Sequence, residues 1–517
     1  MRKLPIGIST LENIINDHCV YIDKSQFVAQ LANAGRYYFL SRPRRFGKSL
    51  FVDTLKQAFL GNKAVFNGLY LEKNWGWDKK HPVIHISFGT GNFTAAGELD
   101  KRINEILQSI AAQYDVSLNK ETHGGNLKEL IEALQKKSGG QVVILVDEYD
   151  KPILDAIIDT EQATLNREIL KGFYGTIKDC DEYLRFVFLT GVTKFSKVGL
   201  FSGLNNLDDI TLSRAYADIC GYTQSELERE FAEYLNKGSV DEVKLKRWYN
   251  GYNFAGSDAQ KVYNPFDILL FFSKNCEYKN YWFETGNPSF LIKLIQKNKY
   301  YFPDMESVTI SDSALSSFDI DQIPLTPLLF QSGYLTIHAV TTIGTQYAYV
   351  LGYPNAEVKA SLNAVLTTIG TTVELRSMLG NKLYICLSNN TLDDMKNIFQ
   401  SHFASIPHDW YRNNDIQHYE GFYASIVYSY FCALGYTVIA EDNTNRGQMD
   451  LTIILPDKIV ILEFKLKKKG DAQSALQQIK DKKYAEKYIS EKKPIYLVGM
   501  IFDGDTRSVC EFLSEVC

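Results

Sequence analysis

Short apolar runs alternate with longer amphipathic stretches through the first part of the chain. The runs at 36–41, 82–88, 141–147 and 184–190 have the length and apolar character of buried strands. Between them, stretches such as 49–60 and 99–114 place apolar residues at helical spacing. Near-continuous apolar strands separated by helices are typical of a parallel sheet covered on both faces. We therefore predict an α/β domain over residues 1–212.

After residue 212 the pattern becomes helical and aromatic, with a strand hairpin expected at 334–337 and 347–351. A second α/β pattern begins near 405–407. A helix over 419–434 and a lysine-rich helix are expected there, with strands at 436–441, 450–455, 459–465 and 495–500. This α-β-β-β-α-β order predicts a compact domain of its own. We expect an α/β multidomain chain divided into 1–212, a helical and mixed region over 213–400, and 401–517.

Composition places this chain among globular proteins. It has 517 residues, 45% of them hydrophobic, and a formal net charge of −5. The longest strongly apolar runs, such as 142–146 and 459–462, are far too short to span a membrane, so we expect no membrane partner. Eight cysteines without a C-x-x-C pair indicate buried thiols in a reducing compartment. We expect a cytoplasmic protein.

A basic loop follows the first apolar run and ends in Gly47, Lys48 and Ser49. Backbone N–H groups at the start of the next helix would cradle phosphate oxygens, and Lys48 would reach the β- and γ-phosphates. The Ser49 hydroxyl would ligate Mg²⁺. Arg42 stands where the first glycine of G-x-x-x-x-G-K-[ST] is expected. A basic turn with a helix-capping serine is the alternative.

A second strand carries the acidic half of a nucleotide site. The run 142–146 ends in adjacent carboxylates, of which Asp147 would hold Mg²⁺ and Glu148 would polarise an attacking water. Thr190, at the end of a later strand, stands where a γ-phosphate sensor is expected. An ordinary strand followed by an acidic turn is the alternative. Together the two half-signals predict ATP binding.

The last third of the chain contains a possible phosphodiester-cleaving site. Asp450 opens one strand and Glu463 closes the next, so a hairpin would bring the two carboxylates together to hold Mg²⁺ or Mn²⁺. Lys465 lies two residues further on, on the same face as Glu463, and could stabilise phosphate charge. Glu420 and Gln478, on flanking helices, could support the site. An edge strand with charged ends is the alternative.

At these positions the sequence resembles a known bacterial family. The carrying motifs are Leu4-Pro5-Ile6-Gly7, Tyr21-Ile22-Asp23-Lys24-Ser25, the loop 42–49, Asp147-Glu148-Tyr149-Asp150-Lys151-Pro152, Thr190-Gly191-Val192, 201–207, 248–252, 330–335 and 352–355. They are similar to the AAA-ATPase-like family, which often carries a C-terminal PD-(D/E)XK nuclease-like domain.

The resemblance implies a P-loop (ASCE/AAA-like) parallel-sheet ATPase followed by a restriction-endonuclease-like α/β domain. The family's loop also carries arginines, so Arg44 and Arg45 could contact phosphates. Carried over position by position, Asp450, Glu463 and Lys465 are the catalytic set, with Glu420 and Gln478 in support. The family commonly has Arg where Gln448 stands, which leaves that phosphate contact open.

Charge is unevenly distributed along this acidic chain, because ten lysines fall between Lys465 and Lys493. Such a concentration beside the carboxylates could follow a phosphate backbone, or it could be a solvated helix with Glu/Lys pairs. The aromatic residues at 248–252 and 281–283 could stack bases, although packing is the more common role. His81 and His85 are interpreted as structural.

Two functional hypotheses follow. The first is an ATPase whose nucleotide state governs a metal-dependent nuclease acting on nucleic acid, with DNA expected. The second is a nucleotide-gated signalling module that binds nucleic acid or protein without cleavage. A homo-oligomer stays open, because ATPases of this broad class often form rings.

Overall fold

A computed structural model describes residues 1–195, 200, 204, 206–256, 259–284, 301–316, 324–368, 371–406 and 420–517. Positions 201–203, 205, 285–286, 407 and 419, on which parts of the motifs and boundaries above fall, lie outside the described residues. The chain forms two compact units, Met1–Gly286 with Val308–Asn355, and Asn287–Ser307 with Ala356–Cys517. These two compact units do not test the predicted domain boundaries, so the division into 1–212, 213–400 and 401–517 stays a prediction.

The first unit is built on a parallel five-stranded sheet. Its order is β2-β3-β4-β1-β5, with β1 Tyr37–Ser41, β2 Val83–Ser87, β3 Val142–Asp147, β4 Leu184–Gly191 and β5 Asp208–Asp209. Each of these pairings is parallel. The apolar runs that predicted strands therefore form the four long ones, and the predicted α/β fold is confirmed. In such sheets, ligands bind at the carboxyl ends of the strands where the strand order reverses.

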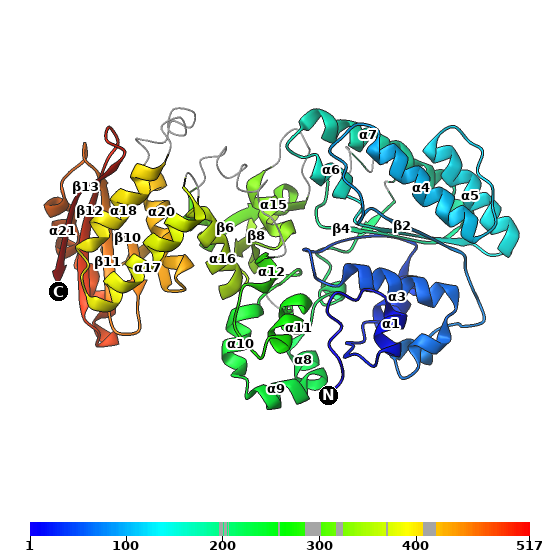
Figure 1. The fold of residues 1–517 in the computed structure, drawn as a ribbon, viewed down its shortest axis with the longest axis horizontal. Coiled ribbons are helices and arrows are strands. Elements are labelled where there is room, and N and C mark those ends of the chain that lie inside the picture. The colour runs from blue at the N-terminus through cyan, green and yellow to red at the C-terminus, as the bar shows by residue number, and fades with distance from the viewer. Residues whose placement is uncertain are drawn as a thin grey trace. The chain divides into compact units, whose positions relative to one another are not determined.

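Helices cover both faces of this sheet (Figure 1). Helices α1 and α3 lie on one side, and α4, α5 and α7 lie on the other. The first seven helices are α1 Leu11–Asn16, α2 Gln26–Ala34, α3 Lys48–Leu60, α4 Glu98–Gln113, α5 His123–Ser138, α6 Lys151–Asp155 and α7 Thr160–Asp179. Side chains of Thr122 and Asp159 cap α5 and α7, and left-handed Gly61 ends α3.

A helical and mixed region completes the first unit. Its elements are α8 Gln224–Glu230, α9 Ala232–Gly238, α10 Glu242–Tyr249, α11 Pro265–Ser273, α12 Tyr281–Glu284, β6 Val308–Ser311, α14 Asp312–Ser316, α15 Leu325–Ser332, β7 Thr336–Ile343 and β8 Gln346–Gly352. The predicted hairpin is β7–β8, and β6 adds a third strand to it.

The aromatic motif of this region is part of the packing. Tyr249 and Tyr252 are fully buried, which confirms the packing interpretation for these two rings. Gly251 between them has φ +123°, and a Cβ there would lie 1.8 Å from the carbonyl oxygen of Pro354. This close approach of two backbones requires glycine.

The second unit holds a mixed sheet of order β13-β12-β11-β10-β9, with helices packed on it. Its elements are α16 Ala356–Leu366, α17 Val373–Asn389, α18 Asp394–Ser405, α20 Glu420–Ala433, β9 Thr437–Thr444, β10 Gly447–Ile454, β11 Ile459–Leu466, α21 Ala472–Asp481, β12 Ile495–Asp503 and β13 Ser508–Val516. The order α20-β9-β10-β11-α21-β12 matches the predicted pattern. The last strand, β13, was not predicted.

Candidate functional site

The loop between β1 and α3 is held by burial of its middle. Phe46 is buried and packs edge-on against Tyr252, with 4.7 Å between ring centroids. Arg45 and Gly47 on either side have φ of 67° and 92°, in the left-handed region. Arg44 and Arg45 are exposed, and the Arg45 guanidinium lies 4.7 Å from the centre of the Phe266 ring. The loop is therefore anchored at Phe46 and presents its two arginines outward.

Lys48 is folded back over this loop. Its Nζ donates hydrogen bonds to the carbonyl oxygens of Arg42, at 3.0 Å, and Pro43, at 2.9 Å. Burial lowers the pKa of Lys48, and the nearby carboxylates of Asp147 and Asp150 oppose that shift. An ammonium group held at a loop of this kind is available to a phosphate that displaces the two carbonyls.

Arg42 does not face the same space as Lys48. It is 1% exposed, and its guanidinium donates to the carbonyl oxygens of Thr211, at 2.8 Å, and Tyr216, at 2.9 Å. The guanidinium also lies 4.1 Å from the centre of the Phe254 ring. Arg42 thus ties the phosphate loop to the chain segment after β5.

The carboxyl end of β3 carries three acidic residues in different settings. Asp147 is buried and accepts a hydrogen bond from the Glu148 backbone N–H at 3.0 Å. Glu148 has φ +52°, an unusual value for a non-glycine residue, and burial followed by the charge of Asp147 raises its pKa. Asp150 is buried and accepts from the N–H of Val192 at 3.0 Å and of Thr193 at 2.6 Å.

Asp150 fixes the ends of β3 and β4 together. A Cβ on Gly191 would lie 2.3 Å from Asp150 Oδ1, so the turn can approach β4 only because residue 191 lacks a side chain. Thr190, the expected γ-phosphate sensor, is fully buried and its hydroxyl donates to the Leu40 carbonyl oxygen at 2.7 Å. In this structure the Thr190 hydroxyl therefore joins β4 to β1.

A cavity of about 590 Å³ lies at these strand ends. Six of the expected nucleotide-site residues line it, namely Arg44, Arg45, Gly47, Lys48, Ser49 and Glu148, whereas Asp147 and Thr190 do not. Part of its wall away from the phosphate loop is apolar and includes Pro5, Ile8, Ile22, Tyr222, Pro265 and Phe266. The cavity thus combines a cationic end with an apolar wall, as a nucleotide requires.

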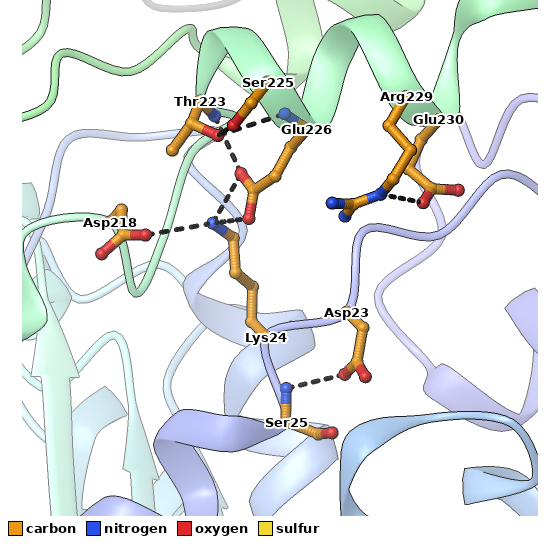
Figure 2. A network of polar contacts seen from close by, with 9 residues as sticks. All are labelled: Asp23, Lys24, Ser25, Asp218, Thr223, Ser225, Glu226, Arg229 and Glu230. Carbon is orange, nitrogen blue, oxygen red and sulfur yellow. Dashed lines mark hydrogen bonds and ion pairs between the residues drawn. The ribbon is translucent and has the colours of Figure 1, made fainter.

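The N-terminal segment forms one wall of this cavity and is bound to α8 by a buried ion pair (Figure 2). Lys24 Nζ donates to both carboxylate oxygens of Glu226, at 2.7 and 2.8 Å, and Asp218 lies 4.0 Å away. Glu226 also completes the capping box of α8 with Thr223. Val20 and Ile22 pack into the hydrophobic core that α8 to α11 share.

A second cluster lies in the other compact unit. Strands β10 and β11 pair as an antiparallel hairpin, and extending the register from Leu451–Leu462 places Asp450 opposite Glu463. Asp450 Oδ2 accepts from the Phe464 N–H at 2.6 Å. Burial raises the pKa of both carboxyl groups, and for Glu463 the neighbouring Asp450 charge raises it further. The expected pair of carboxylates is therefore brought together.

Gln478 on α21 joins the basic and acidic members of this cluster. Its Nε2 donates to Glu463 Oε1, and its Oε1 accepts from Lys465 Nζ at 2.6 Å. Glu463 and Lys465 therefore lie on one face of β11, as the period of two predicts. Glu463 Oε2 is buried without a hydrogen-bond partner. Glu420 Oε2 accepts from the Leu466 N–H at 3.1 Å, close to the same strand end.

The lysine concentration after Glu463 is substantially neutralised by nearby carboxylates. Six of the ten lysines form ion pairs, namely Lys467, Lys468, Lys469, Lys480, Lys483 and Lys487 with Asp503, Asp505, Glu420, Glu515, Glu486 and Asp442 respectively. The expectation of a lysine-rich helix is wrong, because α21 holds one lysine, Lys480, and most of these pairs join separate elements. Only Lys483 and Glu486 form an i,i+3 pair of the expected Glu/Lys kind.

Sequence reasoning missed three residues of the nucleotide cavity or its supports: Lys24, Asp150 and Lys151. All three stand in the motifs that carry the resemblance, and none was given a role. The i,i+4 spacing of Lys151 and Asp155 was a local signal that could have found Lys151. Lys24 and Asp150 have distant partners, and such pairing leaves no periodic signal. Lys24 and Glu226, for example, are separated by 202 positions.

The strand order, the phosphate loop and the acidic end of β3 define a P-loop ATPase-like class, and the second unit defines a PD-(D/E)XK-like class. Residues 5–201 match the family described as "Predicted AAA-ATPase". Residues 418–512 match the "PD-(D/E)XK nuclease superfamily". The predicted resemblance is confirmed.

A relative from Azotobacter chroococcum mcd 1, described as "Uncharacterized protein in vnfD 5'region", is 46% identical over 517 residues and 99% of each chain. The chain belongs to this family of predicted AAA-ATPases with a C-terminal PD-(D/E)XK nuclease superfamily domain. Within the residues that the structure describes, no helix combines the length and apolar character needed to cross a membrane.

Proposed function

We propose that the first unit binds and hydrolyses ATP, and that its nucleotide state governs a metal-dependent nuclease in the second unit that cleaves phosphodiester bonds, with DNA as the expected substrate. The observation that carries this proposal is the pair of sites. Lys48, Ser49 and Glu148 line one cavity. In the other unit Asp450 lies opposite Glu463, and Gln478 joins Glu463 to Lys465.

The residues of the cavity have the chemistry for ATP hydrolysis. Lys48 would bind the phosphates, and Ser49 with the nearby Asp147 would hold Mg²⁺. Glu148 would accept a proton from the attacking water, and its raised pKa suits a general base. The water oxygen bonds to the γ-phosphorus while the bond to the β-phosphate oxygen breaks, giving ADP and phosphate.

The second cluster fits a hard divalent cation. Glu463 Oε2 is buried without a partner, and both carboxyl groups have raised pKa values that a neighbouring cation would offset. Asp450 and Glu463 would hold Mg²⁺ or Mn²⁺, which when bound supplies Lewis-acid activation of the scissile phosphate. In the described ranges no three or more His, Cys, Asp or Glu form a metal cluster, so other oxygen ligands would complete the shell.

Lys465 would stabilise negative charge during cleavage. Gln478 holds the Lys465 ammonium by a hydrogen bond of 2.6 Å, which orients it beside Glu463. Water attacks the phosphorus, the bond to one ester oxygen breaks, and that oxygen takes up the proton that the water loses, giving a phosphomonoester end and a hydroxyl end. Glu420, whose carboxylate accepts the Leu466 N–H, supports the end of β11.

Single substitutions separate the two activities. Lys48→Ala should abolish ATP binding, while Asp450→Ala should abolish cleavage and leave ATP binding intact. The assay compares single- and double-stranded DNA and RNA, with Mg²⁺ or Mn²⁺, in the presence and absence of ATP. Lys63→Ala, an exposed lysine beyond the C-terminal end of α3, and Asp481→Asn, an exposed carboxylate on α21, are the matched controls.

Three outcomes would overturn parts of the proposal. If the wild-type protein cleaves no nucleic acid under any nucleotide condition, the nuclease function is wrong. If cleavage is the same with and without ATP and in Lys48→Ala, nucleotide control is wrong. If ATP does not bind, the ATPase function is wrong.

The second candidate function is a nucleotide-gated binding module without cleavage. The six lysine–carboxylate pairs after β11 leave less positive charge to hold a phosphate backbone for cleavage, which favours this second function. The complete set of Asp450, Glu463 and Lys465 argues against it, because binding alone does not require all three. Full biological activity and intact DNA binding of Asp450→Ala would favour this second function.

A further inference from the structure

Lys151 is a further cation that lines the nucleotide cavity, and it has no role in the site described so far. It is the first residue of α6 and directly follows Asp150, whose carboxylate is fixed by the backbone of Val192 and Thr193. Lys151, Glu148 and Lys48 all line the same cavity. The backbone that carries Lys151 is therefore held in place beside the acidic end of β3.

The Lys151 ammonium is held by two oxygen atoms. Its Nζ donates to Asp155 Oδ2 at 2.6 Å and to the Gly91 carbonyl oxygen at 2.9 Å, and it lies 5.0 Å from the centre of the Phe93 ring. Asp155 also lines the cavity, and the two side chains are 21% and 23% exposed. The ion pair is thus open to the cavity, and a stronger anion there could displace Asp155.

The charges of Lys151 and Lys48 shift the pKa of Glu148 in the same direction. Burial raises the pKa of Glu148, and the charges of Lys48 and Lys151 oppose that shift. Lys48 is carried by the start of α3 and donates to carbonyl oxygens of the phosphate loop, whereas Lys151 is carried by α6, which follows the acidic end of β3. A terminal phosphate beside Glu148 would therefore have a cation on the loop side and another on the α6 side.

We propose that Lys151 is a further catalytic residue, which binds the terminal phosphate of ATP and stabilises its charge during hydrolysis, and that Asp155 holds its ammonium when no nucleotide is bound. The inference rests on the proposed ATPase function. Lys151 keeps its proton throughout; the proton of the attacking water passes to Glu148, and the leaving electrons pass to ADP. A cation supplied within the chain would do what ring-forming ATPases obtain from a neighbouring subunit.

A purely structural role for the Lys151–Asp155 pair predicts a different result for the variant Asp155→Asn. If the pair only stabilises α6, Lys151→Gln and Asp155→Asn should have similar effects. If Asp155 restrains Lys151, the two variants should change terminal-phosphate binding in opposite directions.

The experiment measures ATP and ADP affinity for the full chain, together with ATP turnover. Lys151→Gln should lower the ATP-over-ADP preference by about tenfold, because one charge-assisted contact to the terminal phosphate is lost. It should lower turnover by about a hundredfold while leaving ADP affinity unchanged. Asp155→Asn should raise the ATP-over-ADP preference, and Lys151→Arg should keep most of it. Lys171→Gln, a partly exposed lysine paired with Glu168 on α7, is the control.

The outcomes distinguish a failure of the proposed ATPase function from a failure of the role proposed for Lys151. If wild-type protein binds neither nucleotide, the proposed ATPase function is wrong and this inference is wrong with it. If both nucleotides bind and Lys151→Gln keeps the wild-type preference, only the role of Lys151 is wrong. Equal changes in Lys151→Gln and Asp155→Asn would also overturn that role. Lys151→Arg and Asp155→Asn keep the test open should Lys151→Gln fail to fold.

Discussion

Two buried cations of the phosphate loop, Arg42 and Lys48, serve different parts of the molecule. Lys48 lines the nucleotide cavity, while the Arg42 guanidinium donates to the carbonyl oxygens of Thr211 and Tyr216. Burial lowers the pKa of Arg42 to about 10, so the guanidinium stays charged at neutral pH and needs all its acceptors. Arg42 therefore stabilises the loop, and phosphate contacts fall to other residues.

Replacing Arg42 should reduce stability far more than nucleotide affinity per folded molecule. Arg42→Met removes hydrogen bonds from a charged donor to the carbonyl oxygens of Thr211 and Tyr216, a loss of about 2 kcal/mol or more. Urea unfolding and ADP titration of the same sample measure the two effects. A variant of wild-type stability that cannot bind ADP would contradict this assignment.

The carboxylate pair of the second site should make stability depend on pH in a chelator. Burial raises the pKa of Asp450 and Glu463, so the folded chain binds more protons than the unfolded chain. Their contribution is therefore favourable at low pH and is lost as pH rises through the folded-state values. We expect the melting temperature in EDTA to fall between about pH 5 and about pH 8, and to fall less in Glu463→Gln.

Added Mg²⁺ or Mn²⁺ is the matched arm of that measurement. The cation should restore stability mainly at the higher pH, where both carboxylates are charged, and it should do so less in Glu463→Gln. Identical pH profiles for the wild type and Glu463→Gln would show that this pair does not titrate as described.

Residue types and spacing predicted much of the two sites. Lys48 with Glu148, and Asp450 with Glu463, were expected to come together because each pair follows from strand order or from a hairpin register. The orientation of Thr190 was different from the expectation. Its hydroxyl donates to Leu40, a contact that depends on which strand lies beside β4, and no local pattern encodes that neighbour.

At the level of elements, the N-terminal segment connects the parallel sheet of the first unit to the helical region. Its Lys24 pairs with Glu226 of α8, while its Val20 and Ile22 enter the core of the helices. One wall of the nucleotide cavity thus depends on contacts with residues more than two hundred positions away.

Breaking the Lys24–Glu226 pair should destabilise the first unit. Lys24→Met leaves a carboxylate that is only 9% exposed without its cation, a loss of about 3 kcal/mol, whereas the double variant Lys24→Met with Glu226→Leu should recover most of it. Lys128→Met, which removes one member of an exposed pair on α5, should change stability by about 0.5 kcal/mol or less. Urea unfolding of the wild type, Lys24→Met, Glu226→Leu and the double variant gives the coupling energy.

The strands were the elements best predicted from the sequence. The four long strands of the first sheet are mostly buried, so their boundaries agree with 36–41, 82–88, 141–147 and 184–190 within one or two residues, whereas the two-residue strand β5 was not predicted. Strand β13 was missed because, at the edge of its sheet, residues such as Glu511 and Glu515 interrupt the apolar pattern. Edge strands lack the continuous burial that makes central strands recognisable.

For the molecule as a whole, the net charge of −5 averages over local lysine–carboxylate pairs rather than over an open basic surface. The lysines after β11 have carboxylate partners nearby, so only part of their charge is available to a phosphate backbone. Nucleic-acid binding should then be weaker and less salt-dependent than ten lysines would suggest.

Removing a carboxylate partner should strengthen that binding. Glu486 pairs with both Arg446 and Lys483, each at 3.6 Å. Glu486→Gln frees two cations and should steepen the slope of log affinity against log salt by about one to two units. Glu374→Gln, which removes the same charge from α17, is the control for net charge. An unchanged slope in Glu486→Gln would mean that these cations do not face the nucleic acid.

The contact between Gly251 and the Pro354 carbonyl has a consequence for mutational surveys of this protein. Every side chain larger than hydrogen would overlap an oxygen atom at 1.8 Å, so nineteen replacements should be rejected at a position that touches no ligand. In a saturation scan, residue 251 would tolerate substitution as poorly as Lys48 does. The two causes of intolerance can be told apart only when the yield of folded protein is measured as well as activity. Lys48 variants should give folded protein, and Gly251 variants should not.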